Sequence, residues 1–275
     1  MKTTTLTLLA LFCLSTHALT VTSLNIEWFG RGGTIAGTSA DEYRIQRLRD
    51  FLLVQIPVSD VLVFQEITDV ELLEGSFPEY ECKTYDPRAN HQHVVLCALP
   101  KFNSEFFEIK EVDLGSYGLR PGSGITIEYG KRGLFRKKKT LDIVGVHLKA
   151  GRFESDVRLE QINEIIADES LGKKAIILGD FNSYPKESTE NELGDEELIN
   201  QILAPLGFKQ AQYSGATYLS RFERRFDHAW YKGISLTSTK VFGPCNEESV
   251  ARPYDNFGFF NRFISDHCAL QLVIE

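Results

Sequence analysis

The chain has 275 residues, of which 43% are hydrophobic and 25% are charged, and its formal net charge is −8. These proportions are typical of a globular protein and exclude collagen-like, coiled-coil and disordered chains. The acidic balance excludes long-range attraction to nucleic acid, so a polyanion must be held by local basic groups and metal. No run reaches the roughly 18 apolar residues that a membrane-spanning helix needs.

The N-terminus has the layout of a secretory signal peptide over residues 1–18. Lys2 precedes an apolar stretch over residues 6–14, and Thr16 and Ala18 place small residues at the two key cleavage positions. A buried N-terminal helix is the alternative, but this stretch has no polar face and ends where a strand pattern begins. We therefore expect a secreted or periplasmic protein without a transmembrane segment.

Strand and helix patterns then alternate, and no Gly/Ser-rich or Pro-rich linker divides them, so we predict a single α/β domain over residues 19–275. The first helix follows a capping box at Ser39 and has its apolar face over Ile45–Ile56, and a short second helix begins at Thr68. Further helices are predicted over Ser155–Ala167 and Glu196–Leu203. Strands are predicted over Val21–Glu27, Val61–Phe64, Glu81–Tyr85, Val94–Leu99, Gly124–Tyr129, Thr140–His147, Ala175–Leu178, Asp227–Tyr231, Leu236–Val241 and Ala269–Ile274.

Four cysteines remain once Cys13 leaves with the predicted signal peptide. An even number in an exported chain indicates two disulfides, and four cysteines allow three connectivities. Cys82 and Cys97 lie on neighbouring strand-like segments, and Cys245 and Cys268 are both near the C-terminus, so these two pairs are favoured. Four buried free thiols are the alternative.

Two segments stand out by charge. Lys131–Lys139 carries six basic residues between two predicted strands, which favours the tip of a hairpin. Lys186–Glu197 carries six acidic residues against one lysine, which favours a surface loop. The basic run, like the basic group Arg221, Arg224 and Arg225, is by itself equally well explained as solvated loop charge.

Polar side chains follow several apolar strand patterns. Gln65-Glu66, His147, the segment 179–182 and Asp266-His267 all lie beside such patterns, as does Asn25 in the first strand. A carboxylate at the mouth of a buried strand is costly unless something pairs with it, and several that converge repel one another. A divalent cation removes both problems, and oxygen ligands suit Mg²⁺, Mn²⁺ or Ca²⁺ rather than zinc. Each motif alone has an ordinary structural explanation, whereas their combined order points to a site.

This ordered set resembles the endonuclease/exonuclease/phosphatase superfamily, which includes DNase I, apurinic endonucleases, secreted sphingomyelinases and inositol-phosphate phosphatases. The most specific matches are Val63–Glu66, Leu178–Asn182 and Ser265–His267, and Gly145–Lys149 also matches. The resemblance implies a DNase I-like, four-layer α/β/β/α sandwich, in which two packed, mostly antiparallel sheets are flanked by helices.

The resemblance also implies a metal site. Glu66 would be the principal ligand, with Asn25 and Asp266 close by, and the metal would be Mg²⁺ or else Mn²⁺ or Ca²⁺. Asp180 and Asn182 would face the scissile phosphate and orient the attacking water or a second metal.

Basic and imidazole groups complete the implied site. His267, oriented by Asp227, would accept a proton or stabilise the phosphorane, and His147 would donate to an oxygen on the other side of the phosphate. Arg120 resembles an arginine of DNase I that contacts phosphate.

We therefore expect a secreted, metal-dependent phosphodiesterase that acts as a monomer without an obligate protein partner, most simply a nuclease. Its backbone contacts would come from basic side chains, namely Lys137, Lys138, Lys139, Arg221, Arg224 and Arg225. A sphingomyelinase or phospholipase C-like esterase is the alternative of the same fold. It would need an exposed aromatic element that docks to a membrane. Packing in the core or the site wall explains equally well the candidate residues, which are Phe257, Phe259, Phe260 and Phe263. A binding protein that has lost catalysis is the third hypothesis, against which the complete polar set argues.

Overall fold

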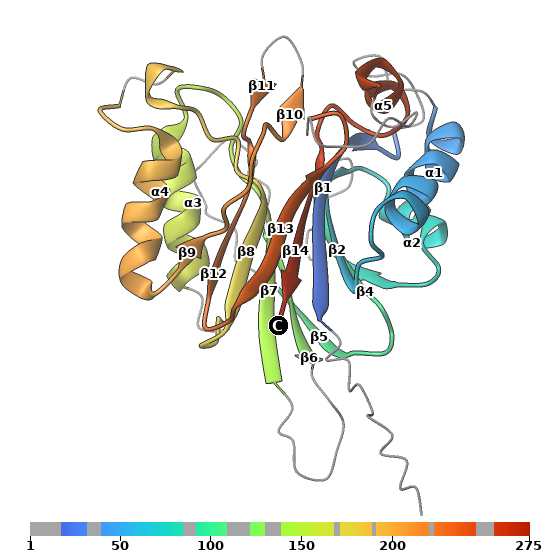
Figure 1. Ribbon diagram of the computed structural model, residues 1–275, viewed down its shortest axis with the longest axis horizontal. Helices are drawn as coiled ribbons and strands as arrows, with labels where there is room; N and C mark the ends of the chain where they lie inside the picture. Colours follow the sequence, from blue (N-terminus) through green and yellow to red (C-terminus); the bar gives the residue numbers. More distant parts are fainter. Residues whose placement is uncertain are drawn as a thin grey trace, which may run out of the picture.

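Two six-stranded sheets pack face to face in the computed structural model (Figure 1). The structure describes residues 18–31, 40–84, 92–108, 122–129, 139–167, 171–188, 191–219, 223–245 and 256–275. The predicted signal peptide lies outside these residues, except for Ala18.

The first sheet has the strand order β13-β14-β1-β2-β4-β3. Strands β1 and β2 run parallel, and the other neighbours are antiparallel. The bounds are β1 (Leu19–Phe29), β2 (Val61–Ile67), β3 (Glu81–Lys83), β4 (His93–Ala98), β13 (Leu236–Phe242) and β14 (Ala269–Ile274).

The second sheet has the order β5-β6-β7-β8-β12-β9, in which only β7 and β8 are parallel. The bounds are β5 (Asn103–Glu108), β6 (Ser123–Tyr129), β7 (Lys139–His147), β8 (Ala175–Asp180), β9 (Lys209–Gln210) and β12 (Asp227–Lys232). A separate two-stranded ribbon joins β10 (Tyr218–Leu219) and β11 (Glu223–Arg224). β5 and this ribbon were not predicted, because short segments with little apolar alternation carry no strand pattern.

Helices cover the outer face of each sheet, so the expected four-layer sandwich is confirmed (Figure 1). α1 (Asp41–Asp50), which continues as a π-helix (Phe51–Gln55), α2 (Val70–Ser76) and α5 (Phe257–Phe263) pack on the first sheet. α3 (Ser155–Ala167) and α4 (Asp195–Leu203) pack on the second, and short 3₁₀ turns span Lys186–Ser188 and Ala204–Leu206. None of the described helices is long and apolar enough to cross a membrane.

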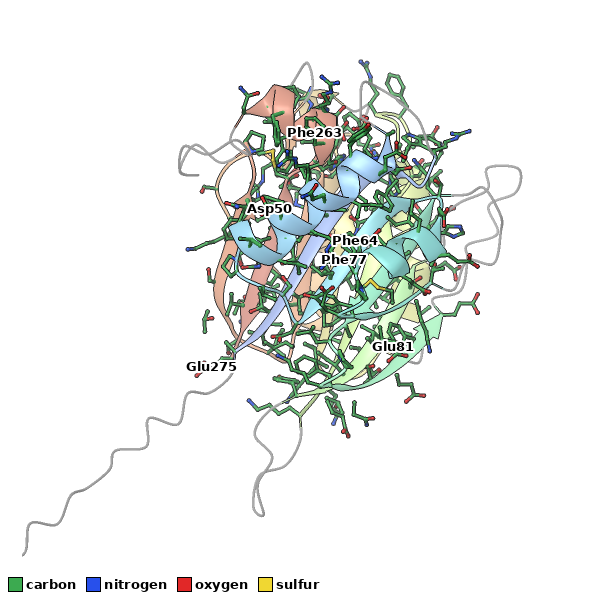
Figure 2. All side chains as sticks on the ribbon, turned by 90° about the vertical axis from the view of Figure 1, so that its right-hand side faces the viewer. Asp50, Phe64, Phe77, Glu81, Phe263 and Glu275 are labelled. Atoms are coloured by element: carbon green, nitrogen blue, oxygen red, sulfur yellow. A yellow bond between two sulfur atoms is a disulfide. The ribbon has the colours of Figure 1, made fainter. Side chains whose placement is uncertain are left out.

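Apolar side chains form three layers, one between the sheets and one under each set of helices. Figure 2 shows Phe64 and Phe77 beneath α1 and α2, and their ring centroids are 5.4 Å apart. Gly145 lets the sheets approach closely, because a Cβ there would lie 2.5 Å from Val63 Cγ1.

Both expected disulfides are present. Cys82 and Cys97 are directly opposite each other on β3 and β4, and Cys245 is bonded to Cys268 immediately before β14. The sequence pattern at the starts of the first two helices was only partly right. Asp69 caps α2 by accepting from the Leu72 N–H at 2.9 Å, whereas Ala40 is the N-cap of α1 and has no side-chain cap.

The acidic segment 186–197 is not wholly a surface loop. Asp195 is 1% exposed and its Oδ2 lies 2.7 Å from an Arg158 Nη atom and 2.7 Å from the Tyr184 N–H. Arg158 is also buried, and it donates to the carbonyls of Lys149 and Gly151 at 2.9 and 2.7 Å. This buried ion pair therefore ties α4 to the loop that follows β7 and to the segment after β8.

The strand directions place several chemically active side chains at one end of the sandwich. β7 and β8 end side by side at His147 and Asp180, and antiparallel β12 begins at Asp227 opposite Asp180. β1 and β2, which are also parallel to each other, bring Asn25 and Glu66 to their carboxyl ends. The carboxyl ends of both parallel pairs thus supply side chains to a single site.

Candidate active site

Asn25 joins two carboxylates that come from different sheets. Its Nδ2 donates to Glu66 Oε1 and to Asp180 Oδ2, both at 3.0 Å. Its Oδ1 accepts from the backbone N–H of Glu27 at 3.0 Å, which fixes the orientation of the amide. Because Asn25 is fully buried, this bridge holds the acidic groups of the two sheets at a set distance.

The backbone around these groups is strained. The described residues include four non-glycine residues with left-handed φ, and all four are at this end of the sheets: Glu27 (41°), Trp28 (51°), Glu66 (63°) and Asn182 (47°). Such conformations cost about 1–3 kcal/mol each and are kept where the surroundings over-determine them. Three of the four coincide with register shifts between β1 and β2 and between β2 and β4. These shifts interrupt the regular alternation of side chains along the strands and change the direction in which the side chains point.

Glu27 belongs to the site although the sequence analysis did not single it out. It is 5% exposed, and its Oε2 has no hydrogen-bond partner among the described residues. Burial raises the pKa of Glu27 to about 8, and the nearby carboxylates of Asp266 and Glu66 add to this rise, while Arg44 opposes it. Buried carboxylates without enough positive charge are what a divalent cation would neutralise, so these residues fit such a metal.

Glu66 is held by several donors at the edge of the site. Its Oε2 accepts from Gln92 Nε2 at 2.7 Å and from the Trp28 N–H at 3.3 Å. One ligand-type atom from each of Glu66, His147 and Asp180 lies within 4.8 Å of the others. Two of these three groups are carboxylates, and hard oxygen ligands favour Mg²⁺, Mn²⁺ or Ca²⁺ over a softer metal.

Asp180 occupies the centre of the polar cluster. Gly179 precedes it with φ 144°, where a Cβ would lie 2.1 Å from the Val146 carbonyl oxygen, so the close approach of β7 and β8 requires glycine. Burial raises the pKa of Asp180 to about 6, against the opposing effect of His267. Its Oδ1 accepts from the Asn182 N–H at 2.8 Å, and Asn182 Nδ2 donates to the Leu148 carbonyl at 3.1 Å.

Two imidazoles approach the same oxygen of the Asp180 carboxylate. His147 Nε2 is 3.4 Å and His267 Nε2 is 3.8 Å from Asp180 Oδ2. His267 Nδ1 lies 2.7 Å from Asp227 Oδ2. Burial opposes protonation of His267, but Asp227 and Asp180 outweigh it and hold the pKa of His267 well above its usual value. His267 is therefore set up to be a cation at neutral pH.

Aromatic rings line the site beside His267. The Tyr218 ring centroid is 4.9 Å from that of His267 and 4.9 Å from that of Phe226, and Tyr184 is 5.2 Å from Phe226. Tyr218 also forms a backbone bridge with His267. These rings give one wall of the site an apolar surface next to the imidazole.

Arg44 links the segments that carry the acidic groups. Its guanidinium donates to the carbonyls of Ile26 and Glu27 in β1 and to that of Ile264, which precedes Ser265–His267. It also contacts Asp41 Oδ1 at 3.4 Å. Arg44 is 2% exposed, so it acts as a buried clamp between β1 and the end of α5.

The structure brings together most of the predicted site residues. Those at one end of the sandwich are Asn25, Glu66, His147, Asp180, Asn182, Asp227, Asp266 and His267. Arg120, Lys137, Lys138 and Arg221 lie outside the described residues. Lys139 begins β7, so it is separated from His147 by the length of that strand, roughly 26 Å at about 3.3 Å per residue.

Three residues that contact the site were not predicted from the sequence: Glu27, Gln92 and Arg44. Glu27 lies two residues after Asn25, and the two-residue period of a strand is a signal that could have identified it. Gln92 lies immediately before β4 and Arg44 lies in α1. Their contacts with the site depend on packing that the local sequence does not reveal.

Comparisons with known proteins agree with this geometry. Residues 22–267 match the Endonuclease/Exonuclease/phosphatase family. Among solved structures, TDP2 from D. rerio in complex with a single-strand DNA product is 14% identical with a TM-score of 0.63, and the match covers 94% of this chain and 99% of that one. A functionally unknown conserved protein from Enterococcus faecalis V583 is 13% identical with a TM-score of 0.62, and the match covers 94% and 99% of the two chains.

A further similar structure is an endonuclease/exonuclease/phosphatase family protein from Bacteroides thetaiotaomicron, which is 14% identical with a TM-score of 0.60, over 94% of this chain and 98% of that one. At these identities the likeness shows a shared fold. No curated protein sequence matches the chain.

Proposed function

Since the chain belongs to the endonuclease/exonuclease/phosphatase family, we propose that it is a divalent-metal-dependent phosphodiesterase that hydrolyses nucleic acid in the manner of a DNase I-like nuclease. The observation that carries this proposal is the cluster around Asp180. It combines acidic oxygens able to hold a cation, a carboxylate with a pKa near neutrality and an imidazolium beside a buried aspartate.

The acidic groups define where the cation and the phosphate would lie. Glu66, Asn25, Glu27 and Asp266 would hold Mg²⁺ or a similar ion. When bound, such an ion supplies positive charge to the phosphate oxygens during attack. Asp180, with its pKa raised to about 6 by burial, is suited to accept a proton from the attacking water near neutral pH.

The two imidazoles that approach Asp180 would act on different oxygens of the phosphate. His267, kept protonated by Asp227, would donate a hydrogen bond to a non-bridging oxygen as negative charge builds up. His147, whose Nε2 also faces Asp180, would donate to the leaving oxygen. Asn182, anchored through its Nδ2 to the Leu148 carbonyl, would help to orient the water.

Nucleic acid is the favoured substrate class because aromatic and cationic groups adjoin the imidazole. The partly buried Tyr218 ring beside His267 can stack on a base or sugar, and the buried Phe226 ring packs against it. Arg224 in β11 is directly opposite Tyr218 in the β10–β11 ribbon. The similarity to TDP2 bound to DNA supports the same choice.

The alternative function, a lipid esterase, would need exposed aromatic side chains on α5 for membrane docking, and α5 offers few of them. Phe260 is 1% exposed and its ring packs edge-on against Phe51 at 5.0 Å, so it belongs to the core. Phe259 packs on Phe263 at 4.8 Å, and Phe257 is 38% exposed. One exposed ring is a small element for docking to a membrane.

Export as a monomer is also part of the proposal. The signal-peptide pattern of residues 1–18 and the disulfides Cys82–Cys97 and Cys245–Cys268 both suit a secreted or periplasmic compartment, because cytosolic thiols are kept reduced.

The purified protein should be incubated with supercoiled plasmid, RNA, sphingomyelin vesicles and bis-p-nitrophenyl phosphate, each with Mg²⁺ and with EDTA. We expect cleavage of plasmid or RNA and of the small diester with Mg²⁺ alone. Preferential hydrolysis of sphingomyelin would replace the nuclease proposal with the lipid-esterase one. Full activity in EDTA would overturn the metal dependence.

A further inference from the structure

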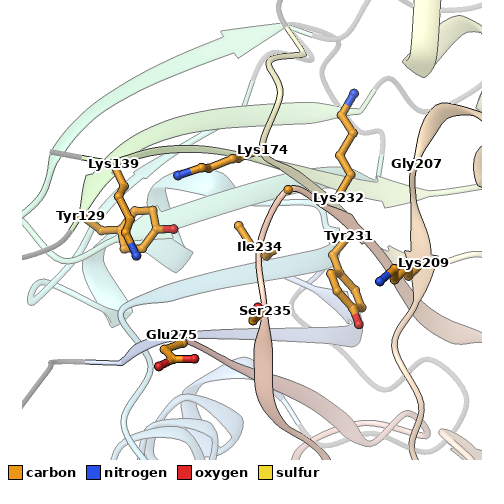
Figure 3. Close-up of a pocket in the computed structure, with 11 residues that line it drawn as sticks. Tyr129, Lys139, Lys174, Gly207, Lys209, Tyr231, Lys232, Ile234, Ser235 and Glu275 are labelled. Carbon is orange, nitrogen blue, oxygen red and sulfur yellow. The ribbon is translucent and has the colours of Figure 1, made fainter. Parts of the chain in front are cut away.

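A second concave site lies at the end of the sandwich opposite the candidate active site. This cavity, of about 460 Å³, is lined by Lys139, Lys174, Lys209 and Lys232 together with Tyr129 and Tyr231, and we call it the lysine pocket. Figure 3 shows Lys139 and Lys174 on the Tyr129 side of the pocket and Lys209 beside Tyr231. In Figure 2, Glu275, which also lines the pocket, and Phe263 of α5 mark the two opposite ends of the molecule.

The same strands serve both sites at their opposite ends. β7 runs from Lys139 in the lysine pocket to His147 in the active site. β12 runs the other way, from Asp227 in the active site to Lys232 in the pocket. The pocket is therefore separate from the candidate active site and is joined to it by two strands.

The lysine pocket gathers positive charge in a protein whose net charge is −8. Glu275 contributes the one acidic side chain among the described residues that line it. Elsewhere on the surface, Lys83 and Lys101 are paired with Glu81 and Asp60.

No ion pair between described residues engages the pocket lysines. The ammonium of Lys139 instead lies 5.8 Å from the Tyr129 ring centroid, and that of Lys232 lies 4.7 Å from the ring centroid of Phe208. Like charges close together repel, so an anion in the pocket would be stabilised by several ammonium groups at once.

We propose that the lysine pocket binds a nucleotide through its phosphate group. Lysine ammonium groups bind phosphate as point charges. The partly buried Tyr231 adds a hydroxyl donor and a ring on which a base can stack, whereas the Tyr129 ring is buried in the core beneath Lys139. The volume lies within the range of roughly 300–1,000 Å³ that is usual for small-molecule sites. The ligand is either a free nucleotide or a nucleotide within a strand, and both present the same phosphate chemistry.

Binding should be measured by calorimetry on the oxidised protein in EDTA, with dTMP, with a 5′-phosphorylated oligothymidylate and with inorganic phosphate as probes. The test variant is K174Q/K209Q, and the matched control is K83Q/K240Q, which removes the same charge from exposed lysines outside the pocket. We expect the test variant to bind dTMP or the oligonucleotide about tenfold more weakly, because two exposed ammonium–phosphate contacts are lost. The control should bind as the wild type does.

Each outcome decides the proposal or the source of the ligand. If K174Q/K209Q binds dTMP more weakly than the wild type does, a free nucleotide is a sufficient ligand. If only its binding of the oligonucleotide is weakened, the ligand is a nucleotide within a strand. Wild-type affinity for every probe in K174Q/K209Q, an equal loss in the control, or no binding to the wild-type protein would overturn the proposal. Hydrolysis of bis-p-nitrophenyl phosphate with Mg²⁺ should be unchanged in both variants. The binding result does not depend on whether the proposed nuclease activity is found, because binding is measured by calorimetry in EDTA.

Discussion

His267 Nδ1 lies 2.7 Å from Asp227 Oδ2, and both side chains are buried in the candidate active site. The two residues come from different parts of the chain, because Asp227 begins β12 and His267 lies just before β14. The aspartate thereby orients the imidazole and favours its charged form.

Asp227→Asn should lower kcat on bis-p-nitrophenyl phosphate by about 100-fold or more, because the amide keeps the shape but no longer stabilises the imidazolium. The pH profile should change with it, since the pKa of His267 falls when the neighbouring charge is removed. Steady-state kinetics from pH 5 to 9 measure both effects. An unchanged profile would mean that this pair only supports the fold.

The stability of the metal-free protein should fall as the pH rises. Burial raises the pKa of Glu27 to about 8 and that of Asp180 to about 6, both from values near 4, so the folded state holds more protons than the unfolded state between about pH 4 and pH 8. The stability contributed by protonated Glu27 is complete below its unfolded pKa of 4.5 and is lost as the pH rises through 8.

Urea unfolding in EDTA from pH 5 to 8 measures this trend. Glu27→Gln should flatten it, because the amide does not titrate. Mg²⁺ should restore stability more at pH 8 than at pH 6. Stability that rises with pH in EDTA would contradict the expected proton linkage.

Glu66→Gln should weaken Mg²⁺ binding by more than about tenfold and abolish activity while the fold is kept. The amide preserves the shape of the side chain but removes the charge at the mouth of β2. Calorimetric titration with Mg²⁺ measures the affinity, and circular dichroism measures the fold. Glu81→Gln is the matched control, because Glu81 is exposed and pairs with Lys83 on β3. Unchanged Mg²⁺ affinity would remove Glu66 from the metal site.

The two disulfides should differ in their effect on activity. Replacing either pair by serine should cost roughly 2–4 kcal/mol of unfolding free energy. Cys268 follows His267, and its Sγ accepts from the Cys245 N–H at 3.1 Å, so C245S/C268S should also lower kcat. C82S/C97S should leave kcat near the wild-type value under conditions where it is folded. Peptide mapping without reduction should recover both linkages, and four free thiols would refute this expectation.

Arg44→Met should lower the free energy of unfolding by about 3 kcal/mol or more, because it leaves three buried carbonyls without this donor and removes the ion-pair partner of the buried Asp41. It should also weaken Mg²⁺ binding, since Arg44 holds β1 against the segment that carries Asp266. Arg47→Met on the exposed side of α1 is the control and should change stability by only about 0.5 kcal/mol. Equal effects of the two substitutions in urea unfolding would show that the contacts of Arg44 do not contribute to stability.

The order of strands and their polar ends could be predicted from the sequence. Apolar runs such as Val61–Phe64 and Ala175–Leu178 identify buried strands, and the carboxylates that follow them, Glu66 and Asp180, must then emerge at strand ends. The pairing of Cys82 with Cys97 was predictable for a related reason, because the two segments are neighbours in the chain and both have a strand pattern.

Only the tertiary structure decided which groups meet across the sheets. Asn25 and Asp180 are 155 residues apart and Arg44 and Ile264 are 220 residues apart, and no local pattern records either contact. The lysine pocket likewise collects residues from the ends of separate strands. Local sequence determines secondary structure through periodicity and burial, whereas the register of the strands and the packing of two sheets depend on the whole core. The polar residues at the strand ends could therefore be named from the sequence, but the contacts of Glu27 and Arg44, the distances within the site, the shifts in pKa and the second pocket follow from the packing.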